Sequence, residues 1–88
     1  MKLSQQVTVK NVLGLHARPA AVIVKLLQGT RSKVWFIYKQ ETVNARSIMG
    51  ILMLAVMQHA IITIEVEGVD ADEIMHRLTE AFDNRFGE

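Results

Sequence analysis

The chain has 88 residues, half of them hydrophobic, and it carries ten Lys or Arg against nine Asp or Glu. That length favours one small domain with a single modest core, and the apolar content is too high for a disordered chain. The net charge of +1 gives no electrostatic footprint for nucleic acid, and the absence of cysteine excludes disulfides and thiolate metal sites.

Nothing in the sequence indicates a membrane span or a targeting segment. The longest apolar run, residues 48–57, contains a glycine and is shorter than the roughly 18 residues that a span needs. The first six residues lack the apolar segment of a signal peptide, so we expect a cytoplasmic protein without membrane insertion. Basic side chains concentrate in residues 10–46 and acidic ones in residues 65–88, and a basic front half suits an acidic or phosphorylated partner.

The first half of the chain predicts a strand, a loop, a helix and a second strand. Val7 and Val9 alternate with polar neighbours, the pattern of a half-buried strand over residues 6–10, and a loop follows over residues 11–15. Apolar residues then recur at i, i+3, i+4 and i+7, which indicates an amphipathic helix over residues 17–28 that ends before Gly29. These residues are Ala20, Ile23, Val24 and Leu27. Residues 33–38, rich in β-branched and aromatic side chains, predict the next strand.

The second half predicts two strands and two helices. A short strand at residues 42–44 follows a turn over residues 39–41 that lacks glycine. A short apolar helix over residues 48–54 would bury Ile51 and Leu54, and a strand over residues 61–67 alternates apolar and polar side chains. The last helix begins at a capping-box-like Asp70–Glu73 segment. Its predicted buried residues are Ile74, Leu78, Ala81, Phe82 and Phe86.

The order βαββαβα predicts an antiparallel sheet with helices on one face, an α+β fold. In such a sheet Val34 and Phe36 point inward, and Trp35 and Ile37 lie on the helix-free face near Ile61. That face could serve as a dimer or partner surface, or be a partly covered sheet face. An RNA-binding domain would need further stacking aromatics there, because Trp35 alone is not enough.

His16 is the residue whose position indicates chemistry. Pro19 is tolerated in the first turn of a helix, so His16 lies at or just before the helix N-terminus, where free N–H groups and the helix dipole favour anions. A neutral imidazole could attack a phosphoryl group and hold it covalently while Arg18 balances the charge. The alternative interpretation of the same residues is a helix-capping histidine beside a solvated arginine.

The segment Gly14-Leu15-His16-Ala17-Arg18-Pro19-Ala20 resembles the active-site signature of HPr, the histidine-containing phosphocarrier of the bacterial phosphoenolpyruvate–sugar phosphotransferase system. Residues 43–50 are similar to the regulatory serine region of that family, and residues 62–68 and 86–88 to its last third. The resemblance covers essentially all 88 residues. It implies a single HPr-like domain over residues 1–88, an open-faced β-sandwich in which three helices cover one face of a four-stranded antiparallel sheet.

The resemblance also implies a function. Nδ1 of His16 would accept a phosphoryl group from phosphorylated Enzyme I and pass it to sugar-specific transporter subunits, so the protein would be a carrier and not an enzyme, without cofactor or metal. Arg18 would neutralise the phosphoryl oxygens, while Gly14, Ala17 and Pro19 would form the phosphoryl-stabilising loop and helix start. An alternative is a regulatory HPr-like module whose phosphorylation state controls binding to transcription factors or enzymes.

Ser47 has two interpretations. It is a plausible N-cap of the short helix, and by resemblance it is a regulatory phosphorylation site for a serine kinase/phosphatase, with a transcription regulator as a further partner. The resemblance also implies a partner-docking surface, although some of its members could be core residues and the lysine could be merely solvated. This predicted surface consists of Ala21, Lys25, Ile48, Met49 and Leu52.

Four other residues stand out. Leu13 occupies a position where family members often carry Asn or Thr, and His59 occupies one where relatives often have a turn glycine. We expect His76 to be solvated, and no histidine pair has a metal-ligand spacing, so we assign no metal. Glu88 could approach Arg18 and modulate it.

Overall fold

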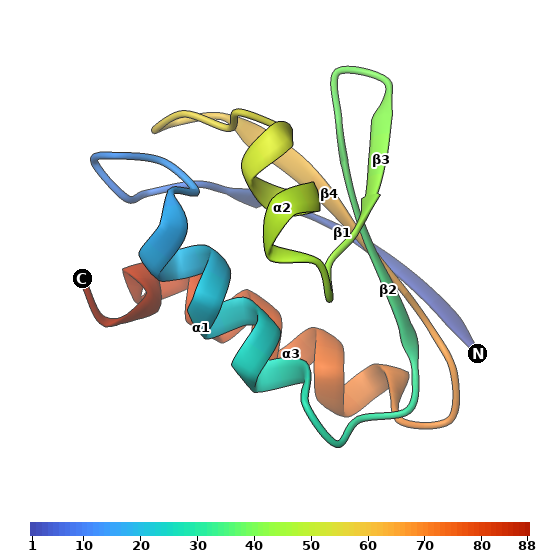
Figure 1. The fold of residues 1–88 in the computed structure, drawn as a ribbon. Coiled ribbons are helices and arrows are strands. Elements are labelled where there is room, and N and C mark those ends of the chain that lie inside the picture. Colours follow the sequence, from blue (N-terminus) through green and yellow to red (C-terminus); the bar gives the residue numbers. More distant parts are fainter.

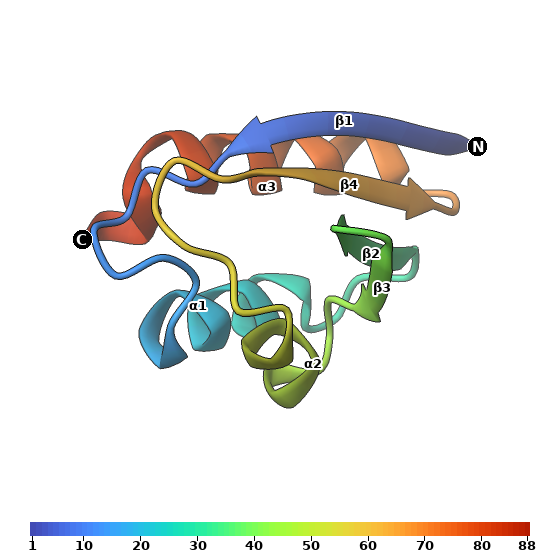
Figure 2. The same ribbon diagram turned by 90° about the horizontal axis from the view of Figure 1, so that it is seen from above.

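The computed structural model describes all 88 residues as one open-faced α+β layer. The strands are β1 (Lys2–Thr8), β2 (Lys33–Tyr38), β3 (Glu41–Asn44) and β4 (Ile61–Glu67). They form an antiparallel sheet in the order β1-β4-β2-β3. The helices are α1 (Ala17–Leu27), α2 (Ile48–Met53) and α3 (Ala71–Asp83), and a short turn, η1 (Arg85–Gly87), follows α3. Figures 1 and 2 show this arrangement, and the predicted fold class and element order are confirmed.

The first strand starts earlier than the sequence predicts. It pairs with β4 from Lys2 opposite Glu67 to Thr8 opposite Ile61, and Val9 comes after its end although that side chain is fully buried. The expectation of a strand beginning at Gln6 is wrong because Gln5 interrupts the apolar alternation that joins Leu3 to Val7 and Val9. An edge strand with one solvated face carries few apolar residues, and pairing with β4 defines its start instead.

The core lies between the sheet and the helices. Alternate residues of β2 and β4 are at most 1% exposed, which confirms the predicted inward face; they are Val34, Phe36, Ile62, Ile64 and Val66. The predicted residues of the last helix are also buried, and Phe82 stands edge-on between Phe36, with ring centroids 5.8 Å apart, and Phe86, at 4.8 Å. Trp35 and Ile37 lie on the other face, half-buried, opposite Glu65 and Thr63 of β4.

The β2–β3 hairpin closes through a two-residue turn without glycine. Lys39 and Gln40 both have positive φ, 48° and 67°, as a type I′ turn requires. This turn matches the twist of the strands, but residues with a Cβ adopt the left-handed region at a cost of about 1–2 kcal/mol each. Strand pairing therefore keeps the turn in a conformation that its own residues disfavour.

Glycine at the second turn position is expected to stabilise the domain. The variant Gln40→Gly removes the steric cost of a Cβ at φ 67°, but glycine loses more conformational entropy on folding than glutamine does. We expect the free energy of unfolding to rise by about 0.5–1 kcal/mol. Urea unfolding measures the change in the free energy of unfolding. Thr42→Gly, in the neighbouring strand, is the control and should lower stability. A loss of stability in Gln40→Gly would contradict the assigned turn.

The predicted capping box at the start of α3 is wrong. The Asp70 carboxylate makes no hydrogen bond within the helix but accepts from the backbone N–H of Arg31 at 2.8 Å, from that of Ser32 at 2.9 Å, and from the Ser32 hydroxyl. Glu73 pairs instead with Arg77 at 2.5 Å. The carboxylate that would otherwise cap the helix therefore binds donors of the α1–β2 connection. The sequence around Asp70 does not reveal these donors, because they lie 39 and 38 positions earlier in the chain.

The Asp70 contacts make stability depend on acid pH. The Ser32 hydroxyl, followed by the Arg31 N–H, lowers the pKa of Asp70. A carboxyl with a depressed folded-state pKa stabilises the fold above its unfolded-state pKa and stops doing so as the pH falls through the folded-state pKa. We expect Asp70→Asn to be less stable than the unmodified chain at about pH 7, with the difference closing as the pH falls below about 4, the ordinary pKa of an aspartate, and through the lowered folded-state pKa. Urea unfolding at each pH tests this, and a pH-independent difference would contradict it.

Candidate functional site

The loop before α1 is held against the segment that precedes β4. Gly14 has φ 67°, and a Cβ on it would lie 2.1 Å from the carbonyl oxygen of Val56. The same carbonyl accepts a hydrogen bond from the N–H of Leu15 at 3.0 Å, and the Leu15 side chain is buried. Glycine is therefore required at position 14, both for its φ and for this close approach.

His16 is the N-cap residue of α1. Its backbone is extended, its carbonyl accepts from the N–H of Ala20 at 3.1 Å, and its side chain makes no capping hydrogen bond. Ala17 and Arg18 follow as exposed residues of the first turn, Pro19 is buried there, and the turn carries no acidic residue. The imidazole is 31% exposed and stands at an uncapped helix end, where N–H groups and the dipole favour an anion.

One nitrogen of the imidazole already has a partner. Nε2 of His16 lies 3.0 Å from one carboxylate oxygen of Glu88 and 3.2 Å from the other. Figures 1 and 2 both show the last residues beside the loop that leads into α1. Because a carboxylate only accepts hydrogen bonds, this contact favours a proton on Nε2. Nδ1 has no hydrogen-bond partner within the chain, so in a neutral ring protonated on Nε2 it would be the nitrogen that carries the lone pair.

A buried asparagine completes this arrangement. Asn11 is 2% exposed, and its Nδ2 donates to the Glu88 carboxylate at 2.5 Å and to the Arg85 carbonyl at 2.9 Å. The hydrogen bond from Asn11 lowers the pKa of Glu88; the contact with His16 acts in the same direction, against partial desolvation. Asn11 could not be identified from the sequence, because no local pattern marks an asparagine whose partners are 74 and 77 positions away.

The structure corrects the expected partner of Glu88. Its carboxylate contacts His16 and Asn11, whereas Arg18 attracts it only through longer-range charge. The Arg18 guanidinium makes no hydrogen bond or ion pair with the rest of the chain, and its side chain is exposed. A cation that contacts no protein anion directly is available to an external anionic group.

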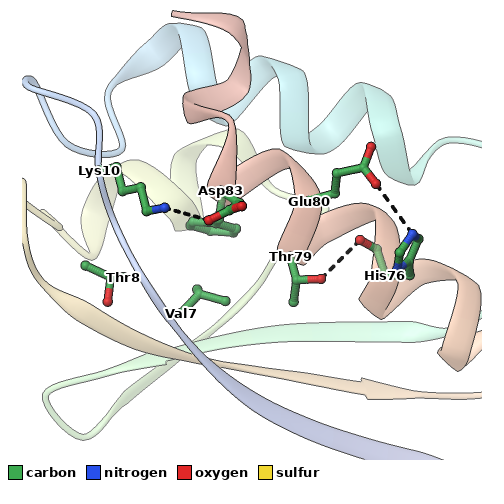
Figure 3. Close-up of a pocket in the computed structure, with 8 residues that line it drawn as sticks. Val7, Thr8, Lys10, His76, Thr79, Glu80 and Asp83 are labelled. Carbon is green, nitrogen blue, oxygen red and sulfur yellow. Dashed lines mark hydrogen bonds and ion pairs between the residues drawn. The ribbon is translucent and has the colours of Figure 1, made fainter.

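Two surface cavities lie near this end of the fold. One, of about 420 Å³, borders the imidazole and is lined by Lys10, Asn11, Val12, Leu13, His16, Gln58, Arg85 and Glu88. Another, of about 460 Å³, lies between β1 and α3. In Figure 3 the ionisable side chains of the cavity between β1 and α3 pair with one another: Lys10 with Asp83 at 2.5 Å and His76 with Glu80 at 3.4 Å. The free imidazole nitrogen and the free guanidinium thus belong to the His16 end of the molecule.

Comparison with known proteins identifies the family to which this chain belongs. Residues 3–84 match the family model described as the PTS HPr component phosphorylation site. The chain belongs to the HPr family. Its relatives include the phosphocarrier protein HPr of Chlamydia muridarum, which is 42% identical over 87 residues, covering 99% of this chain and 84% of the relative.

Solved HPr structures agree with the fold. An HPr from Thermoanaerobacter tengcongensis has a TM-score of 0.93 and 37% identity, covering 98% of this chain and 97% of its own. Crh, the catabolite repression HPr of Bacillus subtilis, has a TM-score of 0.64 and 36% identity, with coverage of 91% and 94%. This HPr is accordingly a phosphocarrier of the bacterial phosphotransferase system. The structure contains no helix with the length and hydropathy of a membrane span.

The predicted docking residues of this HPr are largely at the surface. Met49 is 65% exposed and Ile48 41%, Leu52 is half-buried, and Ala21 and Lys25 on α1 are exposed. Ile51 and Leu54 are buried, as predicted. The exposed apolar set is wider than the sequence analysis proposed, since it also includes Val12, Leu13, Met53 and Met57.

The Ser47 hydroxyl accepts a hydrogen bond from the N–H of Gly50 at 3.0 Å, so the predicted N-cap of α2 is confirmed. Ser47 is also exposed, so its oxygen can be reached from solvent. His76 is exposed beside Glu80. His59, exposed in the turn before β4, has φ 74°, the left-handed conformation that glycine adopts most readily.

Proposed function

We propose that this HPr accepts a phosphoryl group on Nδ1 of His16 from phosphorylated Enzyme I and passes it, in the cytoplasm, to sugar-specific transporter subunits. The observation that carries this proposal is the state of the imidazole. Nε2 is engaged by the Glu88 carboxylate, while Nδ1 is unpartnered on a half-exposed ring at the uncapped start of α1.

The chain's own residues fit each requirement of such a transfer. The Nδ1 lone pair attacks phosphorus as the bond from phosphorus to the donor protein breaks, and the proton on Nε2 stays in place. The Arg18 guanidinium and the N–H groups at the start of α1 take up the charge of the phosphoryl oxygens, with Ala17 and Pro19 shaping that turn. Phosphoryl transfer depends on positioning and charge stabilisation, which a loop fixed by Gly14 provides.

Partner docking is proposed for the exposed residues of α1 and α2. Ala21 and Lys25 on α1 and Ile48, Met49 and Leu52 on α2 form this docking surface. The two helices pack against each other, which supports a docking surface that draws residues from both. Exposed methionines adapt to differently shaped apolar partners, as a carrier that meets a donor and several acceptors requires. Leu13, 68% exposed, adds apolar area and no hydrogen bond to the phosphoryl group.

Labelling with Enzyme I and isotopically labelled phosphoenolpyruvate tests the proposal. The unmodified protein should acquire an acid-labile label, and His16→Ala should acquire none. His76→Ala is the matched control, since it removes an exposed histidine on α3 and should label normally. Arg18→Ala should label more slowly, by roughly tenfold or more if it removes one charge-assisted contact. Label retained in His16→Ala would overturn the assignment.

A second candidate function is regulation through Ser47. Its exposed hydroxyl at the start of α2 and the similarity to Crh, described as a catabolite repression HPr, support a module that a serine kinase/phosphatase modifies and a transcription regulator or enzyme recognises. Ser47→Asp imitates part of the added charge, and aspartate also caps helices, so the domain should stay folded. Reduced labelling by Enzyme I in Ser47→Asp, compared with Ser47→Ala, would support regulation; equal labelling would contradict it.

A further inference from the structure

The residues after α3 adopt an unusual backbone. Arg85, Phe86 and Gly87 have φ values of 58°, 53° and 82°, so three successive residues lie in the left-handed region and two of them carry a Cβ. Backbone hydrogen bonds from Gly87 to Asn84 at 3.2 Å and from Glu88 to Arg85 at 2.9 Å close the turn. Such a conformation persists only where surrounding contacts hold it, and it is often found where a side chain must be placed for function.

Contacts at both ends hold this turn. Phe86 is 9% exposed and packs edge-on against Phe82 in the core. At the other end, the Asn11 amide donates to the Arg85 carbonyl and to the Glu88 carboxylate. These contacts place the Glu88 carboxylate against Nε2 of His16, although the backbone of the preceding residues is strained.

The Asn11 amide has one possible orientation. Exchanging its nitrogen and oxygen would set the oxygen against two acceptors, Arg85 and Glu88, so the hydrogen-bond network itself assigns Nδ2. The buried Oδ1 has no partner within the chain. A buried polar atom without a partner destabilises a fold. Asn11 keeps such an atom, Oδ1, while its Nδ2 orders the Glu88 carboxylate, and this combination indicates a functional residue.

We propose that Asn11 and Glu88 are positioning residues for His16: Asn11 holds the Glu88 carboxylate against Nε2, and this contact keeps the ring proton on Nε2 and the lone pair on Nδ1. The consequence for phosphoryl transfer rests on the function proposed above, in which Nδ1 is the accepting atom. The positioning itself is a property of the free protein.

The effect on chemistry follows from proton and electron placement. An isolated neutral imidazole exchanges its proton between the two nitrogens, and only molecules with the lone pair on Nδ1 can attack phosphorus through that atom. When the Nδ1–P bond forms and the donor bond breaks, the ring becomes cationic with its proton still on Nε2, where the Glu88 carboxylate stabilises it. Neither Asn11 nor Glu88 needs to touch the phosphoryl group.

Nitrogen NMR of the ¹⁵N-labelled imidazoles tests the positioning directly. At about pH 8, above the ordinary pKa of histidine, neutral imidazoles dominate, and we expect the neutral His16 ring to be almost entirely the tautomer with its proton on Nε2. Glu88→Ala should convert it to a mixture of tautomers, with the share of Nδ1-protonated ring rising roughly tenfold. Glu88→Gln should be intermediate, because the amide oxygen can still accept without charge. Glu67→Gln, an exposed carboxylate on β4, is the matched control and should change nothing.

Asn11→Ala provides a second variant with the same expected direction, since Glu88 loses its buried donor. Kinetics of labelling by Enzyme I provide a second readout: the maximal rate of Glu88→Ala should fall roughly tenfold while the Enzyme I concentration for half-maximal rate is unchanged. A purely structural role would leave the tautomer as it is.

The two proposals fail separately. If the unmodified protein takes no label but shows His16 protonated on Nε2 in a Glu88-dependent way, the phosphocarrier reaction is wrong and the positioning stands. If His16 shows the same tautomer mixture in the unmodified protein and in Glu88→Ala, the positioning is wrong, whatever the labelling shows.

Discussion

Replacing Gly14 with alanine is expected to destabilise the domain by about 2–5 kcal/mol and to abolish phosphoryl acceptance by His16. A non-glycine residue at φ 67° costs about 1–2 kcal/mol, and a Cβ placed 2.1 Å from the Val56 carbonyl forces two backbone segments apart at a further cost of about 1–3 kcal/mol. That displacement breaks the hydrogen bond from Leu15 to Val56 that fixes the residue before His16.

Gly29→Ala separates the two causes of this effect. Gly29 has φ 77°, close to that of Gly14, but a Cβ there would meet nothing within 4 Å. Its loss of stability should therefore be about 1–2 kcal/mol, and its labelling by Enzyme I should be normal. Urea unfolding and labelling of both variants provide the comparison. Equal losses of stability would show that the contact with Val56 has no importance.

Phe82→Ala is expected to remove about 3–5 kcal/mol from the free energy of unfolding. The side chain is 1% exposed and lies between the rings of Phe36 and Phe86, so its loss opens a cavity at the centre of the helix–sheet interface. It also removes the ring against which Phe86 packs. Glu88 should then be less well ordered against His16, and the His16 tautomer should become mixed, as in Glu88→Ala.

Leu78→Ala is the control for this second consequence. Leu78 lies on the same helix and is fully buried, and its truncation should cost about 2–5 kcal/mol while the Phe82 ring that packs against Phe86 stays in place. Both variants are compared by urea unfolding and, under conditions where both are folded, by imidazole NMR. The proposed link from core to site would be contradicted if both variants keep the tautomer of the unmodified protein.

The elements that could be predicted closely are those whose pattern is local. Residues 33–38 and 61–67 are strands with the predicted bounds because each alternates a fully buried face with a partly exposed one. The first helix follows from its apolar period and from Pro19 in its first turn. The start of β1 could not be predicted in this way, because pairing with β4 defines it. The Asp70 contacts could not be predicted either, because their donors come from the distant α1–β2 connection.

The same distinction applies to the candidate site. Gly14, His16 and Arg18 lie within five consecutive positions, so one short motif contains them all. Asn11 and Glu88 are 77 positions apart, and only the closed fold brings them to one imidazole. Short-range pattern thus identifies the group that reacts, whereas the groups that orient it depend on tertiary structure.

The strand order has a consequence for how the protein is made. The first strand pairs only with the fourth, Lys2 opposite Glu67, so a nascent chain leaving the ribosome cannot complete its sheet until residues through Glu67 have emerged. Such distant pairings slow folding and leave early segments open to chaperones. The histidine motif emerges well before Glu88, and its ring can meet that carboxylate only once residues through Glu88 have been synthesised.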